Sequence, residues 1–278
     1  MLRAEAALGD CAMPPPITLL TDFGDRDGYV GVMKGIIAGI CPAAALIDLS
    51  HNIPPQNLAA ARFTLLNAYP FFPAGTVHLV VVDPGVGTAR RAIALQTPQG
   101  TFVGPDNGVL SGVFDSLPMA DINAVELTKP EYWRSPQPSQ TFHGRDIFAP
   151  AAAHLAAGVA ITELGKKLDP QTLMRIAIPQ PKISTEQIIG SVQHIDHFGN
   201  LITTIPATAI ADRHWVMQVG SVEIPVGQAY GEVEIGHAIA LVGSHGWVEI
   251  ALNSSSAQAR LRLAIGDEVR LIAKGKSD

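Results

Sequence analysis

The segment Thr76-Val-His-Leu-Val-Val-Val82 is almost wholly apolar and runs directly into Asp83. A short apolar run of this kind is typical of a strand buried on both faces of a sheet. Upstream, apolar runs and helical spacings alternate, and they predict strands and helices in the order Ile17–Thr21, Tyr29–Ile40, Ala45–Leu49 and Gln56–Ala68. This alternation predicts an α/β domain with a mostly parallel central sheet, covered by helices on both faces.

A different pattern follows the break at Pro179-Gln-Pro181. From Ile188 onward, short stretches of alternating polarity are separated by Gly, Pro and Asn, which is typical of a small sandwich or barrel. The clearest predicted strands are Val216–Val219, Val222–Val226, Ala238–Val242, Trp247–Ala251 and Glu268–Ile272. We therefore expect an N-terminal extension at 1–16, the α/β domain at 17–180 and a smaller all-β, barrel-like domain at 186–275.

Composition excludes several classes of protein. The 278-residue chain is 47% hydrophobic and 16% charged, with a net charge of −6, so it is neither disordered nor suited to nucleic acid. No Lys/Arg cluster indicates a membrane surface, and no apolar run reaches the roughly 18 residues that span a bilayer. Without the apolar stretch of a signal peptide, we expect a cytoplasmic protein with free thiols at Cys11 and Cys41. The low charge content also suggests that partner subunits cover part of the surface.

Carboxylates follow the predicted parallel strands, where α/β proteins bind their ligands. Asp22 comes directly after the first strand, and it could accept two hydrogen bonds from a vicinal diol such as ribose, or instead form a turn. Asp48 and His51 follow the second strand and, with Asp22 and Asp83, superficially resemble a metal phosphoesterase set. The chain lacks the His-Asp and Gly-Asn-His sequences of such enzymes, so we expect no metal site.

The third strand leads into the most unusual motif, Asp83-Pro-Gly-Val-Gly-Thr-Ala-Arg90. Its proline and glycines force a tight loop through which backbone could approach a ligand. Asp83 and Arg90 could form a structural ion pair, or they could position a nucleophile. His143 lies just before a helix predicted at Arg145–Ala157. A single histidine is more often a structural residue, but if a site forms here His143 is the best candidate for a general base, because its charge can change near neutral pH.

The second domain contains the turn Asp196-His-Phe-Gly-Asn200. Phe198 could stack on a base and Asn200 could pair with an adenine edge, although an ordinary turn between strands would have the same composition. Two further segments resemble binding loops of the same kind, and their polar residues are Ser244, His245, Asn253 and Ser254.

Five motifs occur together in an order that resembles a known family. They are Thr21-Asp-Phe-Gly24, Val82-Asp-Pro-Gly-Val-Gly-Thr88 with Arg90, Pro105-Asp-Asn-Gly108, Thr141-Phe-His-Gly-Arg-Asp146 and Phe198-Gly-Asn200. The chain resembles the S-adenosyl-L-methionine hydroxide adenosyltransferase family, which is related to the fluorinase and chlorinase enzymes. The resemblance spans residues 16–275 and implies an α/β domain followed by a β-barrel-like domain.

The resemblance implies that water cleaves S-adenosylmethionine to adenosine and L-methionine, with no cofactor, in a homotrimer whose sites lie between subunits. It implies a catalytic set of Asp83, Arg90 and His143 and a ribose contact at Asp22. The other substrate contacts that it implies are Phe198 and Asn200 for adenine, and Asp27, Ser244 and His245 for methionine.

Differences from the halogenating relatives favour water over halide as the nucleophile. Those relatives carry Tyr at the positions of Asp83 and His143, Ser at the position of Gly144, and an insertion where this chain has only Thr97-Pro-Gln-Gly100. The alternatives that stay open are a halide-using S-adenosylmethionine transferase, a non-catalytic adenosine-binding module and a metal phosphoesterase.

At the methionine end the match to the halogenating relatives is looser. Tyr29 and His245 replace a Ser and an Arg of those relatives.

Overall fold

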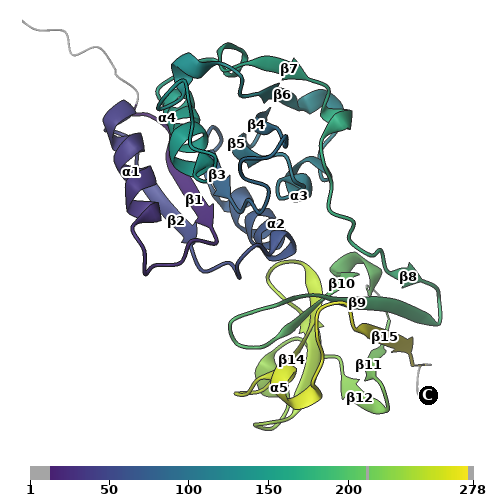
Figure 1. Cartoon of the computed structure of the whole chain (residues 1–278). Coiled ribbons are helices and arrows are strands. Elements are labelled where there is room, and N and C mark those ends of the chain that lie inside the picture. The colour runs from purple at the N-terminus through teal and green to yellow at the C-terminus, as the bar shows by residue number, and fades with distance from the viewer. Residues whose placement is uncertain (1–12, 211–212, 275–278) are drawn as a thin grey trace, which may run out of the picture. The chain divides into compact units, whose positions relative to one another are not determined.

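The computed structural model describes residues 13–210 and 213–274, which form two units divided between Ile176 and Ala177 (Figure 1). Unit 1 contains a seven-stranded mixed sheet flanked by helices, and unit 2 contains an eight-stranded antiparallel sheet. The predicted fold class, α/β followed by a smaller all-β domain, is confirmed. The domain limits 17–180 and 186–275 stay a prediction.

The sheet of unit 1 has the strand order β2-β1-β3-β5-β4-β6-β7. Its strands are β1 (Ile17–Thr21), β2 (Leu46–Ser50), β3 (Val77–Val81), β4 (Ala92–Thr97), β5 (Gly100–Pro105), β6 (Asn123–Glu126) and β7 (Lys166–Leu168). The pairs from β2 to β5 are parallel, and the pairs from β5 to β7 are antiparallel. The tight turn between β4 and β5 can join only antiparallel strands, whereas β1, β2 and β3 are joined by helices that make parallel crossovers.

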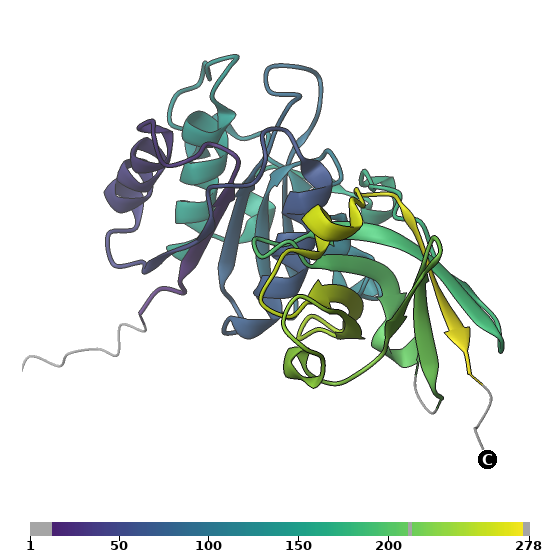
Figure 2. The same ribbon diagram turned by 90° about the horizontal axis from the view of Figure 1, so that it is seen from below.

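Helices cover both faces of this sheet (Figure 2). They are α1 (Tyr29–Ile40), α2 (Leu58–Ala68), α3 (Ser111–Phe114) and α4 (Ala149–Ala156), with a π-helical turn at Gly144–Phe148 leading into α4. Single 3₁₀ turns lie at Tyr69–Phe71, Met119–Asp121, Pro130–Tyr132, Ile161–Glu163 and Pro170–Thr172. Alternate residues of the strands face two separate cores, one under α1 and α4 and the other under α2 and α3.

The predicted helix at Gln56–Ala68 begins two residues later than expected. Gln56 has φ of +63°, a left-handed conformation that cannot belong to a right-handed helix. Asn57 caps the helix instead, because its side-chain oxygen accepts a hydrogen bond of 2.9 Å from the N–H of Ala60. The bounds of β1 and α1 agree with their predictions.

Unit 2 is a strongly curved antiparallel sheet with the order β12-β11-β15-β9-β10-β14-β13. Its strands are β8 (Lys182–Ile183), β9 (Gln187–Ile195), β10 (Leu201–Pro206), β11 (Trp215–Val219), β12 (Val222–Pro225), β13 (Ala238–Val242), β14 (Trp247–Leu252) and β15 (Glu268–Ala273). Short helices lie at Ala207–Ala209, Tyr230–Glu232 and, as α5, at Ala257–Leu261. A bridge between Val226 and Ala240 joins the two ends of the sheet, so the barrel is nearly closed around one apolar core.

The described part of the chain contains no helix with the length and apolarity needed to cross a membrane. Cys41 is a buried free thiol, and Cys11 lies outside the described residues.

His78 lies within β3 and is fully buried. Its Nδ1 atom lies 2.8 Å from the Thr18 hydroxyl, and its ring stacks on Phe102 with 4.8 Å between the centroids. Its Nε2 atom has no hydrogen-bond partner among the residues described. Burial lowers the pKa of His78 to about 4, so the folded protein keeps this ring neutral at pH 7.

The free energy of unfolding should therefore fall as the pH drops from 6.5 towards 4, because the unfolded chain protonates His78 first. Between pH 7 and pH 5 this group should cost about 2 kcal/mol of stability. Denaturant unfolding of the wild-type protein and of His78→Asn at both pH values measures this loss. The variant keeps an acceptor for Thr18 but does not titrate, so equal pH dependence in the two proteins would contradict the prediction.

Candidate active site

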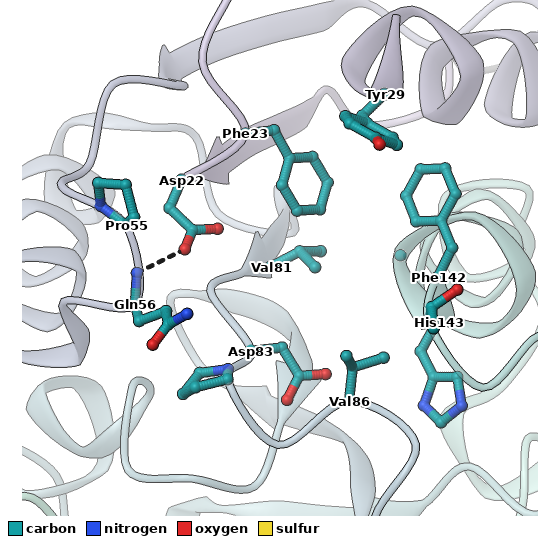
Figure 3. Close-up of a pocket in the computed structure, with 13 residues that line it drawn as sticks. Asp22, Phe23, Tyr29, Pro55, Gln56, Val81, Asp83, Val86, Phe142 and His143 are labelled. Carbon is teal, nitrogen blue, oxygen red and sulfur yellow. Dashed lines mark hydrogen bonds between the residues drawn. The ribbon is translucent and has the colours of Figure 1, made fainter. Parts of the chain in front are cut away.

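The first candidate site lies at the carboxyl ends of β1 and β3. These strands are parallel neighbours with Thr21 opposite Val81, so Asp22 and Asp83 emerge at the same edge of the sheet. A cavity of about 390 Å³ opens there, and Figure 3 shows both carboxylates at its wall. It is lined by Asp22, Phe23, Tyr29, Pro55, Gln56, Val81, Asp83, Pro84, Val86, Thr141, Phe142, His143 and Gly144.

The loop after β3 turns sharply enough to bring Arg90 back to Asp83. Within it, the N–H of Val86 donates to the carbonyl of Asp83 at 3.2 Å, and a second turn follows. Gly87 has φ of +76°, and a Cβ there would lie 2.2 Å from the carbonyl oxygen of Gln140. Only glycine fits this position, which explains the glycine of the sequence motif.

The three residues proposed as a catalytic set are connected, because the guanidinium of Arg90 bonds both Asp83 and His143. The Nε of Arg90 donates to Oδ1 of Asp83 at 2.9 Å, and its Nη2 donates both to Oδ2 of Asp83 and to Nδ1 of His143, the latter at 2.7 Å. All three groups are nearly buried, and the Arg90 side chain also packs over the ring of Phe148. Asp83 and His143 line the cavity, whereas Arg90 bonds both of them without belonging to the lining.

The contact with Arg90 also determines the tautomer of His143. Because arginine can only donate, Nδ1 of His143 is the acceptor, and the ring proton of the neutral form lies on Nε2. Burial lowers the pKa of His143, and the positive charge of Arg90 lowers it further, against the opposing charges of Asp83 and Asp146. The imidazole is therefore neutral near pH 7 and presents an N–H donor.

Asp22 is held by the segment that follows β2. Its Oδ2 atom accepts a hydrogen bond of 2.7 Å from the backbone N–H of Gln56, the residue in the left-handed conformation (Figure 3). Its Oδ1 atom accepts no hydrogen bond from the described residues, so it is available to a ligand hydroxyl. Asp27, by contrast, is exposed in the loop before α1, and it lines neither this cavity nor the two cavities found in unit 2.

Three aromatic rings form the apolar side of the cavity. The centroids of Phe23 and Tyr29 lie 5.8 Å apart, and those of Tyr29 and Phe142 lie 5.3 Å apart in an edge-to-face arrangement. The sequence analysis gave no role to Phe23, Phe142 or the backbone of Gln56. The two phenylalanines belong to the quoted motifs, whereas the contribution of Gln56 depends on its backbone conformation and has no signal in the sequence.

Unit 2 contains a second cavity, of about 750 Å³. It collects all six substrate-binding candidates from this part of the chain, namely Phe198, Asn200, Ser244, His245, Asn253 and Ser254. Asp196 shapes one wall, because its Oδ1 accepts hydrogen bonds from the N–H groups of Phe198 at 2.9 Å and Asn200 at 2.8 Å. The turn leaves Phe198 75% exposed, so its ring is accessible to a flat ligand.

A buried carboxylate that the sequence analysis missed lies at the wall of the same cavity. Glu249 of β14 accepts hydrogen bonds from the Tyr230 hydroxyl at 2.6 Å and from Nε2 of His245 at 2.9 Å. His245 is the donor because its Nδ1 accepts the N–H of Trp247 at 3.2 Å. Burial, followed by the bond to Glu249, raises the pKa of Tyr230 to about 12. A glutamate inside the apolar stretch Trp247–Leu252 was the signal available in the sequence.

Asp48 and His51, considered above as metal ligands, lie next to the first cavity without lining it. Asp48 is paired with Lys34 at 2.6 Å and with His51 at 3.0 Å. No group of three or more His, Cys, Asp or Glu side chains within residues 13–210 and 213–274 is arranged to hold a metal ion.

Residues 17–165 match the SAM hydroxide adenosyltransferase N-terminal domain, and residues 190–270 match the C-terminal domain of the same enzymes. The chain belongs to the SAM hydroxide adenosyltransferase family. This confirms the resemblance seen in the sequence motifs.

Relatives of this family member match most of its length. It is 41% identical over 263 residues to an (R)-S-adenosyl-L-methionine hydrolase of Thermus thermophilus, covering 92% of this chain and 99% of the relative. A fluorinase of Actinoplanes is more distant, at 27% identity, covering 87% of this chain and 92% of the enzyme. The crystal structure of an uncharacterized conserved protein from Thermotoga maritima superposes with a TM-score of 0.85 at 38% identity, covering 92% and 99% of the two chains.

The electrostatic coupling within the Asp83–Arg90–His143 set should be measurable. Arg90→Met should raise the pKa of His143, because it removes the neighbouring positive charge, and Asp83→Asn should lower it, because it removes a neighbouring negative charge. NMR titration of the imidazole C–H signals, assigned with His143→Gln, gives the values. Shifts in the same direction in both variants would contradict the geometry.

Proposed function

We propose that this SAM hydroxide adenosyltransferase hydrolyses S-adenosyl-L-methionine to adenosine and L-methionine. The observation that carries the proposal is the Asp83–Arg90–His143 set at the wall of a cavity that also exposes Asp22. The hydrolase named among the relatives, at 41% identity over almost the full length, supports the same activity.

The reaction places simple demands on the site. The oxygen of water attacks C5′ of the ribose, the C5′–S bond breaks with its electron pair going to sulfur, and a proton is released. Because a sulfonium leaves as a neutral thioether, no acid is needed for its departure. The site must instead hold a weak nucleophile in line with the C–S bond, and such positioning contributes several kcal/mol to catalysis.

Asp83 and His143 would hold that water between an acceptor and a donor. The Asp83 carboxylate accepts a hydrogen bond from the O–H of the water, while the Nε2–H of His143 donates to its oxygen. The charge of Arg90 stabilises the negative charge that develops on the oxygen as its proton is lost. Asp22 would fix the ribose hydroxyls through its Oδ1 atom, so that C5′ faces the water.

The same geometry favours water over a halide. A water molecule or hydroxide carries an O–H that can donate to Asp83, whereas a halide only accepts hydrogen bonds and would be repelled by this carboxylate. The nearly buried Asp–Arg–His set in the wall of the cavity favours a catalytic site over a non-catalytic adenosine-binding module, because binding adenosine alone does not require such a set.

The cavity of unit 2 would hold the remainder of the substrate. Phe198 would stack on the adenine and Asn200 would bond its edge, while Ser244, Asn253 and Ser254 supply further polar contacts. Both ring nitrogens of His245 are engaged within unit 2, so this residue would shape the methionine subsite together with Glu249. We further propose a homotrimer in which unit 2 of one subunit completes the site on unit 1 of its neighbour, as the sequence resemblance implies.

The wild-type protein mixed with S-adenosylmethionine should form adenosine and methionine in equal amounts, with no 5′-halo-nucleoside in chloride or fluoride buffer. Asp83→Ala, Arg90→Ala and His143→Ala should each reduce turnover by about 100-fold, because each removes part of the device that holds the water. Chromatography of the products measures both effects.

Adenosine affinity serves as the control, since it should change little in these three variants. Intact S-adenosylmethionine after long incubation with the wild-type protein would contradict the proposed activity. Near-normal turnover in all three folded variants would contradict only the assignment of the catalytic set.

Activity should return when two inactive variants are mixed under conditions of subunit exchange. Asp83→Ala impairs the proposed water site on unit 1, and Asn200→Ala impairs the proposed adenine contact on unit 2. If sites are shared between subunits, some mixed interfaces combine two intact halves. Turnover before and after exchange measures the recovery, and a fully active monomer by light scattering would contradict the shared site.

A further inference from the structure

Asp48 and His51 follow β2 and were first considered as metal ligands, but the structure uses them differently. His51 is buried, with 6% of its surface exposed, and its Nδ1 atom lies 2.9 Å from the Thr21 hydroxyl at the end of β1. Its Nε2 atom lies 3.0 Å from Oδ1 of Asp48, at ion-pair distance but without the alignment of a full hydrogen bond. The other Asp48 oxygen is bound by Lys34 of α1 at 2.6 Å. A carboxylate, an imidazole and a hydroxyl thus stand in series.

The proton positions in this series follow from the Asp48 carboxylate. The Thr21 hydroxyl oxygen accepts the backbone N–H of Phe23 at 3.2 Å. Because a carboxylate can only accept, the Nε2 atom beside Asp48 carries the ring proton, which leaves Nδ1 of His51 to accept the proton of the Thr21 hydroxyl. Each member therefore has a defined donor or acceptor role, and the Thr21 hydroxyl is held in one rotamer.

Asp22 lies between the two residues that this hydroxyl ties together. Thr21 precedes Asp22 and Phe23 follows it, and the bond from the Phe23 N–H to Thr21 closes a turn around Asp22. The main chain of His51 holds the next residue, since its carbonyl accepts the N–H of Gly24 at 2.7 Å. Five residues further along the same segment, the N–H of Gln56 binds Oδ2 of Asp22.

We infer that Thr21 and His51, supported by Asp48, are positioning residues that aim the Asp22 carboxylate at the ribose of the substrate. This inference rests on the proposed function, which places Asp22 at the ribose. None of the three residues lines the cavity, so they act through the Asp22 turn and not by contact with substrate. Loss of the Thr21 hydroxyl removes the hydrogen bond that closes the turn, while the Asp22 side chain itself is unchanged.

The test compares how tightly variants bind adenosine and 2′-deoxyadenosine, measured by calorimetry on the full chain. The wild-type protein should prefer adenosine, because only ribose offers both hydroxyls to Asp22. Thr21→Val keeps the side-chain shape but removes the hydroxyl, and it should weaken adenosine binding about tenfold, the scale of a hydrogen bond to a charged group. Binding of 2′-deoxyadenosine, which keeps only the 3′-hydroxyl of this diol, should weaken less, so the preference for ribose shrinks. Thr21→Ser should restore it.

The chain provides a matched control on the same strand. Thr18 of β1 is also buried and also bonds a histidine, with 2.8 Å between its hydroxyl and Nδ1 of His78. Thr18→Val removes an equivalent bond remote from Asp22, so it should leave the ribose preference intact. Equal loss of both ligands in Thr21→Val, or a preserved ribose preference, would overturn the inference.

Asp48→Asn gives an independent measurement if Thr21→Val does not fold, since the Asp48 side chain is 42% exposed and its replacement spares the buried strand. It should weaken adenosine binding by about threefold, through loss of the charge that holds His51, and it should weaken 2′-deoxyadenosine binding less. An unchanged preference in this variant overturns the inference. A wild-type protein that releases adenosine and methionine yet shows no ribose preference would overturn the role of Asp22, while the hydrolase activity would stand.

Discussion

The architecture of the first site depends on one buried guanidinium. Arg90 neutralises Asp83, a carboxylate that is almost completely shielded from water, and it fixes the tautomer of His143 through the same nitrogen. Removing one partner from such a group leaves an uncompensated buried charge, which is strongly destabilising. The loop after β3 must therefore fold back on itself, and Gly87 is the residue whose backbone allows it to do so.

The site gains its precision from the sheet on which it is built. Parallel pairing of β1 with β3 brings Asp22 and Asp83 to one edge, although they are far apart in the sequence. In the segment after β2, the third parallel neighbour, the N–H of Gln56 bonds Asp22 and the ring of His51 bonds Thr21, the residue before Asp22. Each carboxylate thus has a rigid strand before it and a fixed partner beside it, which is the arrangement that catalysis by positioning requires.

In unit 2, too, carboxylates hold the residues around a cavity in place. Asp196 organises the turn that exposes Phe198, and Glu249 anchors Tyr230 and His245 from within a central strand. Each of the two cavities described thus has a buried carboxylate in its wall, Asp83 in the first and Glu249 in the second, and both accept hydrogen bonds from neighbouring side chains. The proposed preference for water rests on the side chains of Asp83 and His143, which line the first cavity.

The sequence by itself determined many of the elements, the fold class, the family and nine of the side chains that line the two cavities. It could do so because apolar periodicity and glycine-rich turns are local properties, and because the motifs follow predicted strands. Only the tertiary structure decided that the pairs β4–β5, β4–β6 and β6–β7 are antiparallel. It also decided that Asp27 stays outside the cavity lining, that the Gln56 backbone bonds Asp22, and that Glu249 bonds Tyr230. Those features depend on strand pairing, on a left-handed backbone and on burial, and each of these arises from contacts between residues distant in the chain.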